Sequence, residues 1–222
     1  MNTHNTSSSL TRDWVKFGVL YGFLALFAYL SRFMPLPEGI LLMGYFFFGP
    51  CLILFSISLY YLVQHYRPSA LSGSFLALNA MSGVAVAMMF VVQNLNRHQY
   101  QILRDSESAN FTAEQIRELM TAVFGVQAGI GMVWDIFIFT GTAILAIALI
   151  LIPRLPMRIV GMLGLPIALA GLGFNFYAWP EVNPISIGLP DVGPIVGGWY
   201  GLVYTLHVWA YFRDRDALGD AR

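Results

Sequence analysis

Long runs of apolar residues separated by short polar segments make up most of this chain. Six such runs lie near residues 14–34, 40–62, 70–92, 123–152, 158–178 and 195–212. A helix needs about 20 mostly apolar residues to cross the hydrocarbon core of a bilayer, and each run is about that long. The pattern therefore predicts an all-α fold: a bundle of six transmembrane helices that forms a single membrane domain over residues 1–222.

Three polar segments lie outside these runs. Residues 1–10 form a Ser-rich segment, which we expect to be a flexible N-terminal tail. Residues 93–121 and 179–194 are expected to be loops on the outer side of the membrane. The segment 179–194 contains four prolines and no helical pattern, so an irregular Pro-rich loop is predicted there.

The end of the 93–121 segment has a helix-start signal. Thr112 is followed three residues later by Gln115, which is the spacing of a capping box. Apolar residues then recur at helical spacing, at Ile116, Leu119, Met120 and Val123. This pattern predicts a short amphipathic helix in the outer loop, continuous with the fourth span.

Composition agrees with a membrane location. The chain is 57% hydrophobic and only 11% charged, and its mean hydropathy is +0.65. Its formal net charge is zero, so no basic surface indicates a nucleic-acid partner. The expected partners are the lipid bilayer and either another membrane protein or a second copy of the chain.

The distribution of Lys and Arg predicts the orientation. In a six-span topology both termini share one side, and that side collects eight of the twelve cationic residues: Arg12, Lys16, Arg67, Arg154, Arg158, Arg213, Arg215 and Arg222. The other side collects Arg32, Arg97, Arg104 and Arg117. Because short cytoplasmic loops carry the excess of Lys and Arg, we expect both termini to be cytoplasmic.

Several motifs together resemble a known family. The segment Phe111-Thr112-Ala113-Glu114-Gln115 leads into a Gly-rich span. The motifs Leu155-Pro156-Met157-Arg158-Ile159-Val160-Gly161-Met162-Leu163-Gly164 and Ala170-Gly171-Leu172-Gly173 follow it, and Tyr66-Arg67-Pro68 precedes it. Over residues 60–177 this order is similar to the bacterial domain-of-unknown-function family 4386. The resemblance implies six membrane helices and a bacterial inner-membrane location, and it implies no activity.

Asp135 is the main candidate for a functional residue. It is the only acid at membrane depth, and an ionisable side chain there indicates a functional site. Gln127, Asp135 and Thr142 fall on one helical face with Gly131 and Ile138, and this face should point into the bundle. The alternative is a structural carboxyl group bonded to a neighbouring helix.

Four further polar residues at membrane depth are candidates for a ligand or ion pocket: Asn79, Asn175, Tyr204 and His207. We expect Asn79 or Asn175 to be among the nearest polar groups of Asp135. Each residue also has a structural interpretation as an interhelical hydrogen-bonding group. A stripe of small residues (Gly161, Gly164, Ala168, Gly171) predicts close helix packing along the fifth span.

Three classes of function remain open from the sequence. The first is a small-molecule, ion or proton binding or transport protein with a polar pocket around Asp135. The second is an accessory or assembly subunit of a membrane complex, and the third is an intramembrane enzyme that would use Tyr204 or His207. No hydrolase, metalloprotease or nucleotide-binding motif occurs, so we expect no catalytic residues, metal or cofactor.

Overall fold

The computed structural model describes residues 3–31, 33–105, 112–178 and 188–214, and these residues form six α-helices. In chain order they are α1 (Thr3–Ser31), α2 (Glu38–Tyr66), α3 (Ala70–Asp105), α4 (Ala113–Ile150), α5 (Leu155–Ala178) and α6 (Gly193–Arg213). The predicted all-α fold is therefore confirmed. Five of the described helices, α1 to α5, are long and apolar enough to cross a membrane.

The sixth predicted span, α6, is not among those five helices. It carries Tyr200, Tyr204 and His207, whose polar groups lower the average hydropathy of the segment. Trp199, Tyr200 and His207 are nevertheless almost completely buried against other helices. Neighbouring helices thus satisfy the polar groups on the buried face of α6.

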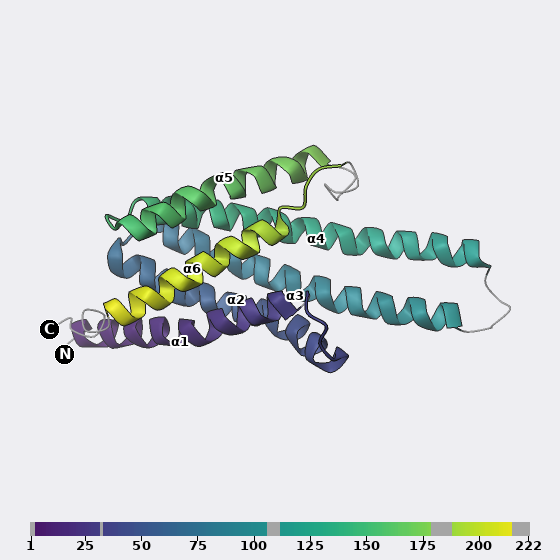
Figure 1. Ribbon diagram of the computed structural model, residues 1–222, viewed down its shortest axis with the longest axis horizontal. Coiled ribbons are helices and arrows are strands. Elements are labelled where there is room, and N and C mark those ends of the chain that lie inside the picture. Colours follow the sequence, from purple (N-terminus) through teal and green to yellow (C-terminus); the bar gives the residue numbers. More distant parts are fainter. Residues whose placement is uncertain (1–2, 32, 106–111, 179–187, 215–222) are drawn as a thin grey trace.

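The helices pack in the order in which they occur in the chain. Each of α1 to α4 packs against its successor, and α6 contacts both α1 and α5, which closes the bundle (Figure 1). The first residues of α1 and the last of α6 lie at the same end, which we call the terminal end. The opposite end, where α3 ends and α4 begins, is called the hairpin end.

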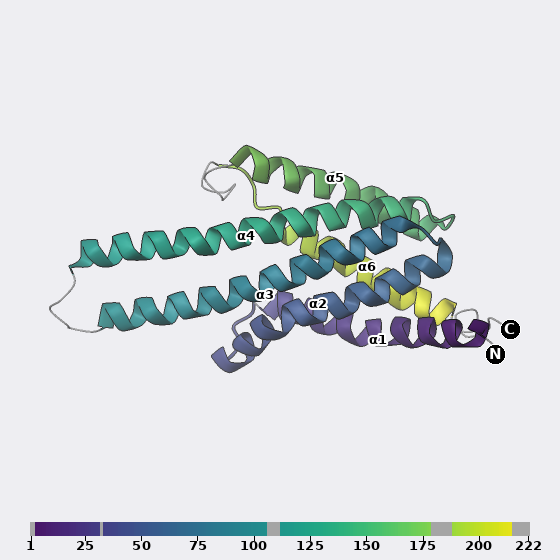
Figure 2. The same cartoon turned by 180° about the vertical axis from the view of Figure 1, so that it is seen from behind.

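The α3 and α4 helices are longer than a bilayer requires. They have 36 and 38 residues, which at about 1.5 Å per residue exceeds the roughly 30 Å hydrocarbon core by more than 20 Å. Figures 1 and 2 show that both project as an antiparallel pair beyond the other helices. The expected loop over residues 93–121 is therefore corrected, because α3 continues to Asp105 and α4 already begins at Ala113. Mutual packing of the two helices explains how this polar stretch stays helical.

The predicted capping box is present at the start of α4. The Thr112 hydroxyl oxygen accepts a hydrogen bond of 3.2 Å from the Gln115 backbone N–H. The Gln115 side-chain oxygen in turn accepts one of 2.8 Å from the Thr112 N–H. Two backbone donors that a helix start would leave unsatisfied are thereby satisfied.

Two other expectations concern the terminal segments. Within the N-terminal segment expected to be a flexible tail, residues 3–10 form the first turns of α1, because extending an existing helix is far easier than nucleating one. Of the predicted Pro-rich loop, residues 179–187 lie outside the described residues. Residues 188–192 are not helical, and Gly188 adopts a left-handed φ of 81°, a conformation that glycine tolerates best.

Candidate functional site

Asp135 lies on α4, where this helix packs against α5. It is partly buried, and the side-chain amide of Asn175 on α5 is close enough to stabilise its carboxylate. The expectation that Asn79 or Asn175 is among its nearest polar groups is therefore met by Asn175. The Asn175 Nδ2 atom also donates a 2.9 Å hydrogen bond to the Gly171 carbonyl, which fixes the orientation of the amide.

A second acid lies near Asp135. Asp191 precedes α6, and its negative charge is close enough to act on the Asp135 carboxyl group. The Asp191 Oδ1 atom accepts a 2.8 Å hydrogen bond from the Gly193 N–H, which holds this carboxylate at the start of α6. The proximity of Asp191 to Asp135 is not predicted from the sequence. Asp191 lies in a Pro-rich segment, which has no periodic pattern from which its position in the fold could be inferred.

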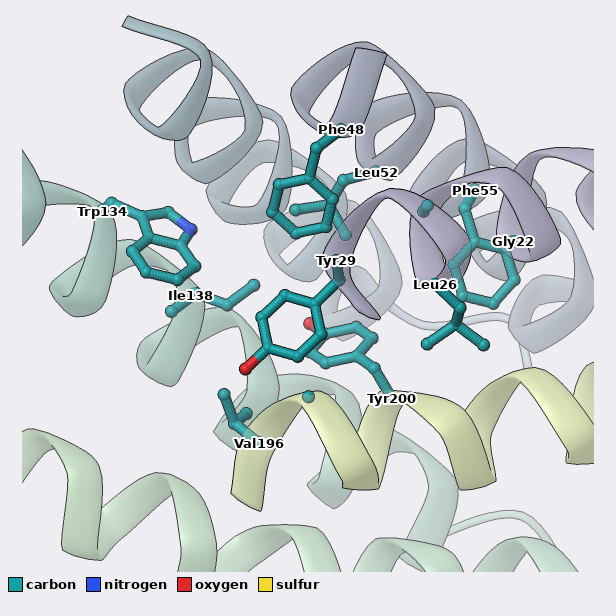
Figure 3. Close-up of a pocket in the computed structure, with 12 residues that line it drawn as sticks. Gly22, Leu26, Tyr29, Phe48, Leu52, Phe55, Trp134, Ile138, Val196 and Tyr200 are labelled. Carbon is teal, nitrogen blue, oxygen red and sulfur yellow. The ribbon is translucent and has the colours of Figure 1, made fainter. Parts of the chain in front are cut away.

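An apolar cavity lies between α1, α2, α4 and α6 (Figure 3). Five aromatic rings and four larger aliphatic side chains form most of its lining, together with small residues from α1 and α6. The lining residues are Gly22, Ala25, Leu26, Tyr29, Phe48, Leu52, Phe55, Trp134, Ile138, Val196, Gly197 and Tyr200. Asp135 is not one of them, although its chain neighbour Trp134 is.

Trp134 contributes a free hydrogen-bond donor to this cavity. Its Nε1 atom is buried and has no hydrogen-bond partner. Figure 3 shows the indole nitrogen on the ring edge that faces the cavity. A buried polar atom without a partner is costly and is rare in native structures, so this N–H is available to a ligand acceptor. The sequence alone does not distinguish this donor from an ordinary packing residue, so Trp134 is not predicted as part of a site.

Asn79 belongs to a different hydrogen-bond network, which joins four helices. Its amide nitrogen donates to the Tyr200 hydroxyl of α6 at 2.9 Å and to the Ser56 hydroxyl of α2 at 3.1 Å. The Thr142 hydroxyl of α4 donates to the same Tyr200 oxygen at 3.4 Å. All four side chains are buried. Asn79 thus holds the Tyr200 ring in the cavity wall and does not contact Asp135 through any of these bonds.

His207 and Tyr204 bind α6 to α1. The His207 Nε2 atom lies 2.8 Å from the Val15 carbonyl, and because a carbonyl only accepts, Nε2 carries the proton. The Ser58 hydroxyl lies 3.2 Å from the same nitrogen, whereas Nδ1 has no partner. The Tyr204 hydroxyl donates to the Val19 carbonyl at 3.1 Å. These two residues therefore lie toward the terminal end, away from Asp135.

Gln127, the remaining candidate, bonds within the α3–α4 pair. Its side-chain oxygen accepts a 3.2 Å hydrogen bond from the Asn96 amide of α3. The six predicted residues thus do not form one site: Asp135 lies with Asn175 and Tyr204 lies with His207, whereas Asn79 and Gln127 each belong to another network. Among the described residues, no three His, Cys, Asp or Glu side chains lie close enough together to hold a metal ion.

A polar cluster at the terminal end was also missed. The Asp214 carboxylate, at the end of α6, accepts a hydrogen bond from Tyr66 of α2 and forms an ion pair with Arg154 at 3.1 Å. The Arg154 guanidinium lies 4.6 Å from the centre of the Tyr66 ring. Each residue lies at the end of a predicted span, and hydropathy gives no signal for contacts between span ends.

Comparison with known protein families, with curated proteins and with solved structures finds no match to this chain.

Proposed function

We propose that this protein is a small-molecule binding protein of the membrane whose ligand inserts an apolar group into the cavity between α1, α2, α4 and α6, which has a volume of about 40 Å³. The observation that carries this proposal is the free Trp134 Nε1 donor in an aromatic-lined cavity. Ligand sites are typically apolar and aromatic, with a few placed polar groups. The sequence suggested the same broad class of function, binding with or without transport. The proposed binding site is now the cavity lined by Trp134 and not a polar pocket around Asp135.

Hydrogen bonding around the cavity supports a preformed site. Tyr200 is held by Asn79 and Thr142, and the Tyr29 hydroxyl donates to the Gly193 carbonyl at 3.0 Å. Both aromatic walls are therefore fixed by bonds that reach between helices. A wall that is already ordered loses little conformational entropy when a ligand binds.

The membrane placement is part of the same proposal. All six helices cross the membrane, the terminal end lies in the cytoplasm, and the projecting ends of α3 and α4 form an amphipathic extension on the outer side. The Lys and Arg asymmetry and the shared end of the two terminal helices support this orientation. We further propose a bacterial inner-membrane location and membership of domain-of-unknown-function family 4386, on the motifs given above.

The test is to fill the cavity and measure bound small molecules. Ala25 lines the cavity and is 5% exposed, so Ala25→Leu should occupy ligand space. Protein purified in mild detergent would be analysed by native mass spectrometry and extraction of bound molecules. We expect a molecule that co-purifies with the unchanged protein and is lost from Ala25→Leu. Ala122→Leu is the matched control, because Ala122 is exposed on α4. An equal content of bound molecules in all three proteins would contradict the proposal.

A role as an accessory subunit is the second candidate function. The projecting part of the α3–α4 pair favours it, because exposed apolar side chains lie on that part, among them Leu95, Tyr100 and Leu119. Apolar side chains outside the bilayer are typical of surfaces that bind another protein. Removing this surface with Leu95→Gln and Leu119→Gln should then abolish co-purification of a membrane partner or of a second copy.

A further inference from the structure

An open apolar groove lies on the surface of the bundle, between α2, α3 and α4. Its lining consists of Ile53 of α2, five residues of α3 between Ala80 and Met88, and Val133 and Phe137 of α4. Its volume is about 430 Å³, against about 40 Å³ for the internal cavity described above. Figure 2 shows α3 between α2 and α4 in this part of the bundle. The groove is therefore a separate site, which a ligand reaches from the surface.

The groove presents apolar side chains to its surroundings. Met81, Val84 and Met88 line it and are each about half exposed, at 49%, 54% and 54%. Ala80 lies among them, and its methyl side chain leaves space between the larger ones. Methionine is flexible and adapts its shape to an irregular apolar partner. The lining thus suits a partner that is apolar and requires no hydrogen bond.

Close contacts at glycines fix the walls of the groove. A Cβ atom at Gly83 of α3 would lie 2.5 Å from the Cγ1 atom of the groove-lining isoleucine of α2. Between α3 and α4, a Cβ atom at Gly141 would overlap the Asn79 side chain, and one at Gly131 would lie 3.4 Å from the Met89 Sδ atom. The groove lies between these two levels of the α3–α4 pair. Its shape is therefore set by helix packing and requires little ordering when a ligand binds.

The position of the groove along α3 places it within one half of a bilayer. The helix begins at Ala70, just after the polar turn that contains Arg67, and α2, α3 and α4 are each long and apolar enough to cross a membrane. At about 1.5 Å per residue, Ala80 lies about 15 Å beyond Ala70, and Met88 lies about 27 Å beyond it. The hydrocarbon core is about 30 Å thick. The groove therefore extends from near the midplane to the edge of the core that is nearer the hairpin end.

This extent matches one lipid chain. The groove runs about 12 Å along α3, which is close to the roughly 15 Å that a lipid chain covers in one half of the core. A partner's transmembrane helix would need a contact surface along most of the roughly 30 Å core, more than twice what the groove offers. An acyl chain lying in the groove would contact α2, α3 and α4 at once and gain dispersion contacts on three sides.

From these observations we propose that the groove is a binding site for one acyl chain of a bilayer phospholipid. This inference goes beyond the proposed function, because the groove is separate from the internal cavity and requires only that the helices cross a membrane. Lipid chains are as apolar as the side chains that line the groove, so packing and not transfer from water provides the preference. A chain in the groove exchanges with the bilayer more slowly than a chain that touches a single exposed helix face.

The test measures where a lipid chain contacts the protein. The full-length protein would be reconstituted in vesicles of phosphatidylethanolamine and phosphatidylglycerol that contain a phosphatidylglycerol with a diazirine in the middle of one acyl chain. After irradiation, the labelled residues would be located by peptide mass spectrometry. We expect residues 80–88 to carry about threefold more label than residues 165–173 of α5, because only the groove holds the chain on three sides. Residues 165–173 are the matched surface, since they lie equally far from the start of their helix.

Variants that fill the groove test its role. Val84→Phe adds a larger side chain at a position that is 54% exposed, so the variant should still fold, and Ala80→Leu fills the groove from a second position. Each should lower the labelling of residues 80–88 to the level of α5, a decrease of about threefold. Leu169→Phe, at a 57% exposed position on α5, is the matched control and should leave labelling of the groove unchanged. Thermal unfolding of each variant would verify that it is folded.

Three results would overturn the assignment of the groove. The first is equal labelling of the two surfaces in the unmodified protein, and the second is preferential labelling that Val84→Phe and Ala80→Leu both leave unchanged. The third is protection of residues 80–88 from the lipid probe together with cross-linking of the groove to a second protein chain, because a protein helix would then occupy it. Ala25→Leu fills the internal cavity and should not change labelling of the groove, so failure of this inference and failure of the proposed function are distinguishable.

Discussion

The hydroxyl group of Tyr200 on α6 lies 2.9 Å from the side-chain amide nitrogen of Asn79 on α3, in the buried interior of the bundle. This bond connects two helices that are far apart in the chain, and through Ser56 and Thr142 it extends to α2 and α4. It also fixes one aromatic wall of the proposed ligand cavity. The network therefore links the stability of the bundle to the shape of its cavity.

Tyr200→Phe should destabilise the protein by about 1 to 3 kcal/mol, because it leaves the buried Asn79 amide without its closest partner. Thermal unfolding in detergent would measure the loss. Tyr211→Phe is the matched control, because the Tyr211 hydroxyl forms no hydrogen bond in the described structure and its removal should cost much less. Equal melting temperatures for the two variants would show that the Tyr200 network contributes little.

His207→Leu should loosen the attachment of α1. The substitution removes the hydrogen bond to the Val15 carbonyl and the contact with Ser58, in a site that is fully buried. A buried carbonyl and hydroxyl then lose a partner, which costs about 1 to 3 kcal/mol each at most. Hydrogen exchange in residues 12–22 should rise, while exchange in α5 stays unchanged. A uniform rise throughout the protein would indicate global destabilisation instead.

The stability cost of replacing a glycine of α5 should depend on what a Cβ atom at that position would contact. A Cβ at Gly161 would lie 2.6 Å from the Ala146 carbonyl oxygen, and one at Gly171 would overlap the Phe139 ring, whereas one at Gly173 meets nothing within 4 Å. Gly161→Ala should therefore cost about 1 to 3 kcal/mol, and Gly173→Ala should be neutral or slightly stabilising. Unfolding measurements on both variants check this. Gly22 would not serve as a control, because a Cβ there would lie 2.6 Å from Tyr204.

Thr112→Ala should destabilise the start of α4 by about 1 kcal/mol, because it removes one half of the capping box. Hydrogen exchange of residues 113–122 is the measurement, and we expect it to increase. Thr121→Ala on the same helix is the control, since the Thr121 hydroxyl only bonds the Arg117 carbonyl one turn earlier. Absence of protection in the unmodified protein would contradict a stable helix at this end.

Reporter fusions should establish the topology. Fusions after Arg67, Arg154 and Arg222 are expected to report the cytoplasm, and fusions near Asp105 and Asp191 the outer side. An outer location for Arg154 would contradict the six-span arrangement.

The number and type of the helices could be predicted from the sequence, because burial in lipid requires long apolar runs whatever the packing. The capping box at Thr112 was predictable for a similar reason, since its two bonds join residues only three apart. The helix extension to Asp105 was not predictable, because polar residues there are stabilised by the neighbouring helix and not by the bilayer.

The candidate site depended on distances across the bundle. The sequence alone singled out Asp135 from the cost of an ionisable group in an apolar run, and it offered Asn175 and Asn79 as neighbours. Only the tertiary structure shows that Asn175 and Asp191 lie close to Asp135, whereas Asn79 bonds Tyr200. Such proximity depends on how the helices are rotated and offset relative to one another. The cavity likewise exists only in the packed bundle, because its twelve lining residues come from four helices, none of which could enclose that space alone.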